Sequence, residues 1–121
     1  MSLETSVICS LADPKYLTSV KGEKHQFNVD EPIEYHGEDT APKPTEYLLG
    51  ALGSCTAITM KMYAQRKKWE LGEISVSVTL KKEINSVENI IIKRVSFQKK
   101  LSTEKIERLL KIAEKCPVSK L

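Results

Sequence analysis

The stretch PTEYLLGALGSCTAITMKMYAQRKKW, residues 44–69, determines how the rest of the chain is interpreted. It carries no charged side chain between positions 47 and 60, and it places a cysteine, Cys55, in the middle of that apolar run. The run is shorter than the roughly 20 residues that a transmembrane helix needs. The first question is therefore whether Cys55 is an ordinary buried thiol or a functional one.

The same stretch predicts a long helix. Pro44 suits the first turn, because its missing N–H would have no partner there, and Glu46 favours the positive end of the helix dipole. We expect the helix to run from position 44 or 45 to about Lys68, and to be buried on most sides because its first part is apolar nearly all round. Gly50 and Gly53 inside it predict that another backbone or helix lies very close.

The segments around this helix alternate between strand and turn patterns. Strands are expected within residues 5–12, 16–21 and 24–30, followed by a loop over residues 31–44. Residues 73–82 alternate, with Ile74, Val76, Val78 and Leu80 on one side, and residues 88–101 form a second strand joined by a hairpin link over residues 83–89. The order is typical of an α+β fold.

A second helix is expected near the end of the sequence, from about Thr103 to Cys116. Ser102 or Thr103 would cap it, Glu104 would lie in its first turn, and Pro117 would end it. Ile106, Leu109, Leu110 and Ala113 form its apolar stripe.

The composition restricts the possible functions. The chain has 121 residues, which fits a single domain over residues 1–121, and its net charge of +3 comes from 19 basic and 16 acidic side chains. The basic residues are scattered and aromatic residues are few, so no nucleic-acid partner is expected. The first residues lack the features of a secretory signal, and we expect a cytoplasmic protein with no membrane partner.

The chain has three cysteines at wide spacing, which is not a disulfide framework. Taken singly, Cys9, Cys55 and Cys116 each fit an ordinary core thiol, Cys9 most of all because it lies in the first predicted strand. As a pair, Cys55 and Cys116 interrupt or end two apolar helices beside small or hydroxyl residues. A redox-active pair is an alternative that needs the two Cα atoms within about 7 Å.

The combination of residues 44–69 with CPVSK at residues 116–120, preceded by FNVDEPIEYHGEDTAPKPTEYLL, resembles the OsmC/Ohr superfamily. These are the osmotically inducible protein C and organic hydroperoxide resistance proteins, and the small OsmC-like branch is the most similar. The resemblance implies an OsmC-like α+β fold, with antiparallel sheets packed around a long central helix in an interlocked homodimer. Relatives commonly continue with another strand after the second cysteine, so this sequence is expected to be either a short form without that strand or truncated before it.

The resemblance also implies a thiol peroxidase for organic hydroperoxides in oxidative-stress defence. Cys55 would attack the peroxide, Cys116 would resolve the sulfenic acid to a disulfide, and an external dithiol such as a lipoyl protein would reopen it. Cys116 at a helix C-terminus would face a dipole that disfavours a thiolate, which suits a resolving thiol. No cofactor or metal is expected, since His25 and His36 lack the spacing of zinc ligands.

Peroxidatic relatives pair an arginine from an early loop with a glutamate at the start of the cysteine helix. Glu46 matches the glutamate, whereas the first arginine of this chain is Arg66 and Lys15 stands near the expected place. Lysine supplies the charge without the planar fork of arginine. The alternative is therefore a non-enzymatic OsmC-like protein that binds a small hydrophobic ligand or senses oxidation in the same pocket.

Overall fold

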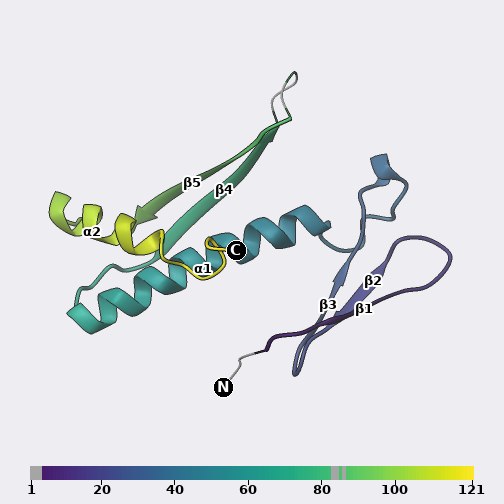
Figure 1. Ribbon diagram of the computed structural model, residues 1–121, viewed down its shortest axis with the longest axis horizontal. Helices are drawn as coiled ribbons and strands as arrows, with labels where there is room; N and C mark the ends of the chain where they lie inside the picture. The colour runs from purple at the N-terminus through teal and green to yellow at the C-terminus, as the bar shows by residue number, and fades with distance from the viewer. Residues whose placement is uncertain (1–3, 83–84, 86) are drawn as a thin grey trace. The chain divides into compact units, whose positions relative to one another are not determined.

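The computed structural model describes residues 4–82, 85 and 87–121 (Figure 1). The chain divides into two compact units, Met1–Tyr47 and Leu48–Leu121. Each unit has its own antiparallel sheet, and the long helix begins in the first unit and continues into the second. The elements give an α+β fold, as predicted from their order, while a single domain over residues 1–121 stays a prediction.

Three short strands form the sheet of the N-terminal unit: β1 (Ile8–Leu11), β2 (Thr18–Lys21) and β3 (Gln26–Val29). The strands pair antiparallel in the order β1-β2-β3. Each strand lies within one of the β-prone runs that the sequence predicts. Cys9 lies on the edge strand β1, opposite Val20, and its side chain is exposed. The expectation that Cys9 is a core thiol is wrong, because every residue of β1 is exposed.

Polar contacts order the loop that leads to the long helix. Asp30 is buried and accepts hydrogen bonds from the backbone N–H of Glu31 (2.7 Å) and from both the N–H (3.1 Å) and the hydroxyl (2.7 Å) of Thr40. The Thr40 hydroxyl does most to hold the pKa of the Asp30 carboxyl below its usual value. A 3₁₀ turn, η1 (Ile33–Tyr35), lies within the loop, which forms where the sequence predicts it.

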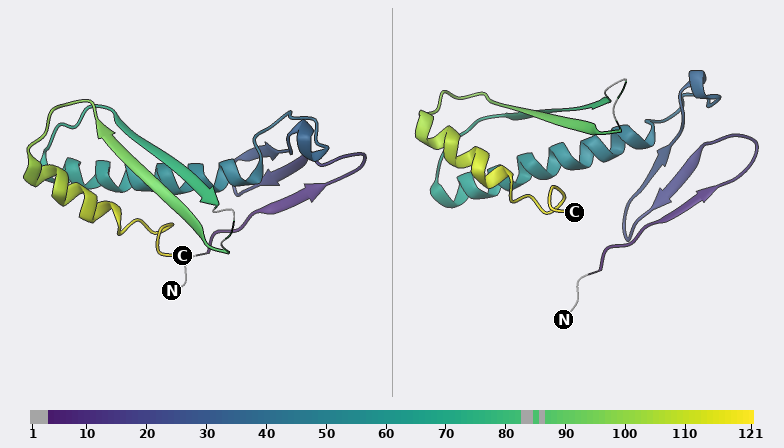
Figure 2. Two further views of the ribbon diagram at one scale, coloured as in Figure 1. Left: turned by 90° about the horizontal axis from the view of Figure 1, so that it is seen from above. Right: turned by 45° about the horizontal axis from the view of Figure 1, so that its top comes forward.

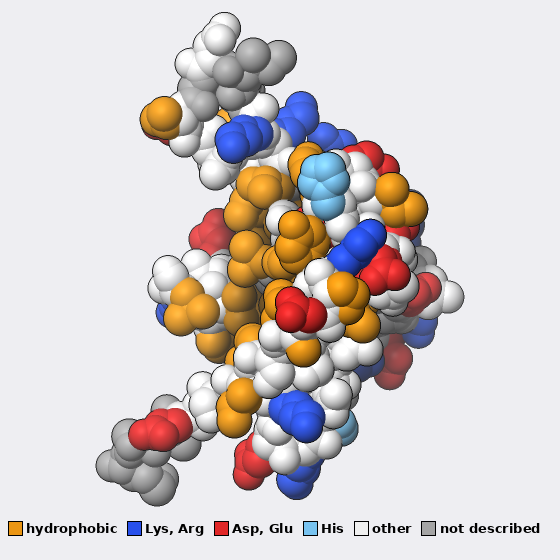
Figure 3. All heavy atoms as spheres, turned by 90° about the vertical axis from the view of Figure 1, so that its right-hand side faces the viewer, with side chains coloured by type: hydrophobic (Ala, Val, Ile, Leu, Met, Phe, Trp, Pro, Cys, Tyr) orange, Lys and Arg blue, Asp and Glu red, His pale blue; other side chains and the backbone are white. Residues whose placement is uncertain are grey.

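Helix α1 (Pro44–Lys67) confirms the predicted long helix nearly to the residue. One stripe of it is buried, formed by Gly53, Thr56, Met60, Tyr63 and Ala64 at the spacing of a helix face. Away from this stripe, Leu48, Ile58 and Met62 are 60%, 53% and 60% exposed. The expectation of burial on most sides is therefore wrong for the single chain. Figure 3 draws the exposed hydrophobic side chains of one face in orange.

The C-terminal unit adds a hairpin and a short helix. Strands β4 (Ile74–Lys82) and β5 (Asn89–Phe97) pair antiparallel, with Val78 opposite Lys93. Ile74, Val76 and Val78 are half-buried as predicted, whereas Leu80 is 38% exposed. The predicted link over residues 83–89 lies partly outside the described residues, at positions 83, 84 and 86.

Helix α2 (Thr103–Ala113) begins where predicted, with the Ser102 hydroxyl accepting a hydrogen bond from the Lys105 N–H at 3.3 Å. It ends at Ala113, three residues before the predicted end at Cys116. Cys116 therefore lies in the turn that follows the helix. Among the described residues, no helix combines the length and the apolar character needed to span a bilayer.

The core of this unit lies where α1, α2 and the hairpin meet (Figure 2). Met60 and Leu109 are fully buried at its centre. Gly53 allows the hairpin to approach α1, because a Cβ built there would lie 2.9 Å from a methyl carbon of Val78. The predicted close neighbour of Gly53 is thus a strand, whereas a Cβ on Gly50 would meet nothing within 4 Å.

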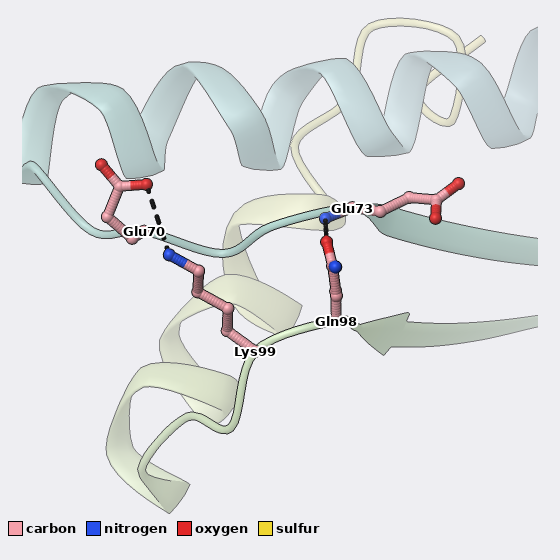
Figure 4. Close-up of polar contacts among 4 residues, drawn as sticks. All are labelled: Glu70, Glu73, Gln98 and Lys99. Atoms are coloured by element: carbon pink, nitrogen blue, oxygen red, sulfur yellow. Dashed lines mark hydrogen bonds and ion pairs between the residues drawn. The ribbon is translucent and has the colours of Figure 1, made fainter.

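The segment that leads into β4 and the segment that leaves β5 are hydrogen-bonded to each other (Figure 4). The Gln98 side-chain oxygen accepts a hydrogen bond from the Glu73 N–H at 2.8 Å, and the Gln98 N–H donates to the Glu73 carbonyl at 2.9 Å. Lys99 pairs with Glu70 at 3.7 Å, but both side chains are more than half exposed, so this ion pair stabilises the fold little. The backbone bonds fix where α2 starts relative to α1.

Candidate functional site: a buried thiol pair

Helix α1 holds Cys55 next to its buried stripe. Cys55 is half-buried and is followed by Thr56, whose hydroxyl is fully buried and donates to the Leu52 carbonyl at 2.9 Å. One turn later the Thr59 hydroxyl donates to the Cys55 carbonyl at 2.8 Å. These bonds follow the helix backbone and fix the side-chain rotamers around Cys55.

The turn after α2 carries Cys116 into the interior. Its N–H donates to the Ala113 carbonyl at 3.3 Å, and its side chain has no exposed surface. Pro117 follows, and the next backbone N–H groups, of Val118 and Ser119, donate to the Cys116 sulfur together with the Ser119 hydroxyl. A buried sulfur that accepts several hydrogen bonds is stabilised in its negatively charged thiolate form.

The structure brings Cys55 and Cys116 together as free thiols joined by a hydrogen bond. Burial alone would raise the pKa of Cys116, but the hydrogen bonds from Cys55, Ser119 and Val118 outweigh it and lower the pKa to about 6. The lowered pKa favours a negative charge on Cys116 at neutral pH.

The expectation that Cys116 faces an unfavourable helix dipole is wrong. Helix α2 ends at Ala113, and the turn beyond it points N–H groups at the sulfur. Donors in direct contact outweigh the residual field of a helix end, which falls off within the last turn.

Lys93 is the cation that the structure adds to this site. Its side chain is half-buried, and its ammonium donates to the Thr56 hydroxyl oxygen and to the Ser119 hydroxyl oxygen, both at 3.3 Å. Lys93 therefore bridges the residue after Cys55 and a residue that donates to Cys116. A lysine in this place supplies positive charge to a pair that carries a thiolate.

Sequence reasoning missed Lys93, although a signal for it is present. On β5 the side chains of Val95 and Phe97 are half-buried against the core, and Lys93 lies on the same face because side chains alternate along a strand. A lysine at an inward position of a strand needs a partner, since a buried charge is costly when unpaired. That rule would have marked Lys93 as a candidate.

Lys15 and Glu46, the other two candidates, belong to the N-terminal unit. Lys15 lies between β1 and β2 and helps to line a cavity of about 490 Å³ within that unit. The Glu46 carboxylate accepts a hydrogen bond from the Lys43 N–H at 3.3 Å in the first turn of α1. Glu46 therefore has a capping role in this structure.

A larger cavity, of about 740 Å³, lies between α1 and the segment from α2 to Lys115. Its lining includes Met62 and Ile112, and also Thr59, which bonds the Cys55 carbonyl, and Lys115, which precedes Cys116. Over the described ranges, no cluster of histidine, cysteine and carboxylate side chains has an arrangement that could hold a metal ion.

Comparison with known proteins places this site in a family. The family model described as OsmC-like protein matches residues 37–121, which is more than half of the chain and includes both cysteines of the pair. The chain belongs to the OsmC-like protein family. Its sequence matches no curated protein.

Solved structures show that the whole OsmC-like fold is shared. A protein of Psychrobacter arcticus, described as an osmotic stress induced and detoxification response protein, superposes with a TM-score of 0.82 at 19% identity, over 99% of this chain and 89% of that one. The OsmC-like protein from Mycoplasma pneumoniae gives 0.76 at 16% identity, over 99% and 87%. The organic hydroperoxide resistance protein OhrB of Bacillus subtilis gives 0.65 at 20%, over 98% and 89%.

Proposed function

We propose that this OsmC-like protein is a thiol-dependent peroxidase that reduces organic hydroperoxides in oxidative-stress defence. Cys55 is the attacking thiol and Cys116 the resolving thiol. The observation that carries the proposal is the pair itself, in which a partly exposed thiol is hydrogen-bonded to a buried one that has a lowered pKa. Thiolate character is what a thiol needs to attack the sulfur of a sulfenic acid, so the lowered pKa suits Cys116 as the resolving thiol.

The reaction balances with the two thiols and an external dithiol. The Cys55 thiolate attacks the terminal oxygen of the hydroperoxide, the O–O bond breaks, and the departing alkoxide takes a proton to become an alcohol. Cys55 is then a sulfenic acid, and the Cys116 thiolate attacks its sulfur, forming a disulfide and releasing hydroxide. A dithiol such as a protein-bound dihydrolipoyl group reduces the disulfide by exchange.

The preference for organic substrates that we propose assumes that the substrate's organic group occupies the cavity along α1, whose lining begins at Thr59, one turn after Cys55. Met62 and Ile112 give it apolar walls, and its volume of about 740 Å³ is enough for an alkyl or aryl group. Hydrogen peroxide would gain nothing from these walls, so we expect a preference for alkyl hydroperoxides.

A homodimer is part of the proposal. Leu48 and Ile58 of α1 are more than half exposed in the single chain, and large apolar side chains exposed on one helix are typical of an interface. A second copy of the chain would cover them, and sedimentation at micromolar concentration should give about twice the mass of 13.6 kDa. The three free cysteines fit a reducing compartment such as the cytoplasm.

The alternative is an OsmC-like protein that binds a small hydrophobic ligand or senses oxidation without turnover. One observation favours it: Arg66 is the first arginine in the sequence, so the early part of the chain has no arginine to orient a peroxide. Such a protein would keep the fold and the cavity but would consume no peroxide.

Consumption of cumene hydroperoxide with a dithiol donor tests the proposal. The wild type should turn over, Cys55→Ser should lose all consumption, and Cys9→Ser should keep it because Cys9 is exposed on β1. Intact-mass spectrometry after one equivalent of peroxide should show loss of two hydrogens in the wild type and gain of one oxygen in Cys116→Ser. Absence of turnover with every dithiol donor, in a folded protein, would establish the alternative.

A further inference from the structure

This inference rests on the proposed peroxidase function and concerns what keeps the resolving thiol beside the attacking one. We propose that Lys93 is a positioning residue whose hydrogen bonds to Thr56 and Ser119, the Lys93 bridge, hold the turn after Cys116 against helix α1. The bridge lets the disulfide form before a second hydroperoxide oxidises the Cys55 sulfenic acid further.

The segment that carries Cys116 is bonded mostly to itself. The backbone N–H groups of residues 115, 116, 120 and 121 each donate to a carbonyl three residues earlier. Of residues 114–121, Cys116 is buried and Val118 is half-buried, while the others are exposed. A segment with so few buried side chains opens easily, so a hydrogen bond from another element matters for where it lies.

The Lys93 ammonium joins this segment to the helix of Cys55. It donates at 3.3 Å to the hydroxyl oxygen of Ser119, three residues after Cys116. It also donates at 3.3 Å to the hydroxyl oxygen of Thr56, the residue after Cys55. Because one nitrogen contacts both oxygens, the chain next to each cysteine lies within reach of a single ammonium group.

The position of Lys93 is itself fixed by the packing of the hairpin on α1. Lys93 on β5 pairs with Val78 on β4, and a Cβ built on Gly53 would lie 2.9 Å from a methyl carbon of Val78. Gly53 is two residues before Cys55, so the hairpin contacts α1 next to the attacking thiol. The half-buried side chain of Lys93 has already lost part of its rotamer freedom, which lowers the entropy cost of the bridge.

Two reactions compete for the Cys55 sulfenic acid. The Cys116 sulfur attacks it, and after proton transfer the products are a disulfide and water. Alternatively, a second organic hydroperoxide transfers one oxygen to it, and the products are a sulfinic acid and an alcohol. The first reaction needs the two Cα atoms within about 7 Å, so it stops whenever the turn leaves α1, whereas the second continues. The Lys93 bridge therefore sets how the sulfenic acid is divided between them.

Intact mass after an excess of cumene hydroperoxide, with no dithiol present, tests the bridge. Lys93→Met should raise the ratio of sulfinic acid to disulfide about tenfold, the factor expected when a hydrogen bond from a charged group is lost. Lys93→Arg keeps a charged donor and should restore most of the disulfide. Arg94→Met is the matched control, because it removes the same charge from the next residue of β5, which is exposed. A lower melting temperature in Lys93→Met with an unchanged ratio would show a purely structural lysine and overturn the role.

A double variant separates the bridge from the charge of Lys93. Ser119→Ala removes one acceptor and keeps the ammonium, so it should raise the ratio as Lys93→Met does. Because both substitutions break the same bridge, the double variant should give no larger ratio than either single variant. Effects that multiply would mean that Lys93 acts through its charge, and the bridge would be wrong.

The accessibility of Cys116 tests the bridge without peroxide. With Cys9→Ser and Cys55→Ser, Cys116 is the remaining thiol, and since it is buried, a chromogenic disulfide reagent reaches it when the turn opens. Adding Lys93→Met should speed this reaction about tenfold. A faster reaction in a protein that no hydroperoxide oxidises would refute the peroxidase and support the bridge. An unchanged reaction would overturn the bridge, whatever the peroxide does.

Discussion

Two sites along the buried stripe of α1 contain an ionisable side chain, Cys116 at one and Tyr63 at the other. A different basic residue forms hydrogen bonds at each site. At the thiol end, formed by Cys55, Thr56, Lys93 and Cys116, Lys93 donates to the hydroxyl oxygens of Thr56 and Ser119, and the Ser119 hydroxyl donates to the Cys116 sulfur. At the aromatic end, formed by Tyr63, Trp69 and Arg108, the Arg108 guanidinium donates directly to the Tyr63 hydroxyl at 2.9 Å. This bond is the main cause of the lowered pKa of Tyr63.

The difference lies in what surrounds the acceptor. At the aromatic end, the cationic groups of Arg66, Lys67 and Arg108 lie 5.6, 5.7 and 5.8 Å from the centre of the Tyr63 ring, and the arginines and Lys67 are exposed to water. At the thiol end several donors meet one fully buried sulfur, and the pKa of Cys116 falls to about 6. The comparison teaches that converging donors on a buried atom, more than the presence of cations, make a reactive group.

Met60→Ala should have the largest effect on stability, because Met60 is fully buried on α1 between the two ends. Truncating such a side chain in a core costs about 2–5 kcal/mol. Urea unfolding, monitored by Trp69 fluorescence at one end and by the reactivity of Cys116 at the other, should give the same loss of unfolding free energy with both probes. Met62→Ala is the matched control: Met62 is 60% exposed, so its loss should be small in the single chain. Exposure of the thiols before Trp69 changes would mean that the ends unfold separately.

Ionisation of the thiol pair should follow pH in a defined direction. Because the pKa of Cys116 is about 6 in the folded chain and near 9 without these contacts, the thiolate should appear as pH rises through about 6. Ultraviolet absorbance of the thiolate measures this, and Cys116→Ser should remove the transition. A titration that begins only near 9 would show that the donors to Cys116 are weaker than the structure indicates.

The same shift links the thiol to folding. An acidic group whose pKa is lower in the folded state than in the unfolded state stabilises the folded state fully at pH values above the unfolded pKa. This contribution is lost as the pH falls through the folded pKa. The contribution of Cys116 should be complete above about 9, decline between 9 and 6, and vanish below 6. Unfolding free energies of the wild type and Cys116→Ser should therefore diverge as the pH is raised.

The sequence was sufficient where local rules decide the structure. Pro44 and Ser102 mark helix starts, and the alternation from Ile74 to Val78 marks a strand, because each follows from contacts within a few residues. The resemblance supplied Cys55 and Cys116 as candidates, and the structure places them together. Their reaction with peroxide stays a prediction.

The sequence was insufficient where contacts between distant segments decide. The lowered pKa of Cys116 depends on N–H groups in a turn whose backbone the helix pattern did not reveal, since α2 ends three residues before the cysteine. Lys93 on β5 bonds to Thr56 on α1 and to Ser119 in the C-terminal turn, and no spacing in the sequence predicts these contacts. The exposure of Cys9 depends on a sheet that leaves β1 at an edge.

Tyr63→Phe should have the smallest effect, and it sharpens the comparison between the two ends. It removes the acceptor of the Arg108 bond but leaves the ring against Trp69, 5.6 Å between centroids, so the cost should be about 1 kcal/mol. Arg108 is exposed and can bond to water instead. Because no bond of Lys93 or Cys116 involves Tyr63, the thiolate titration should stay at about 6. A shift of that titration in Tyr63→Phe would mean that the aromatic end tunes the thiols through α1, and the two ends would then be one site.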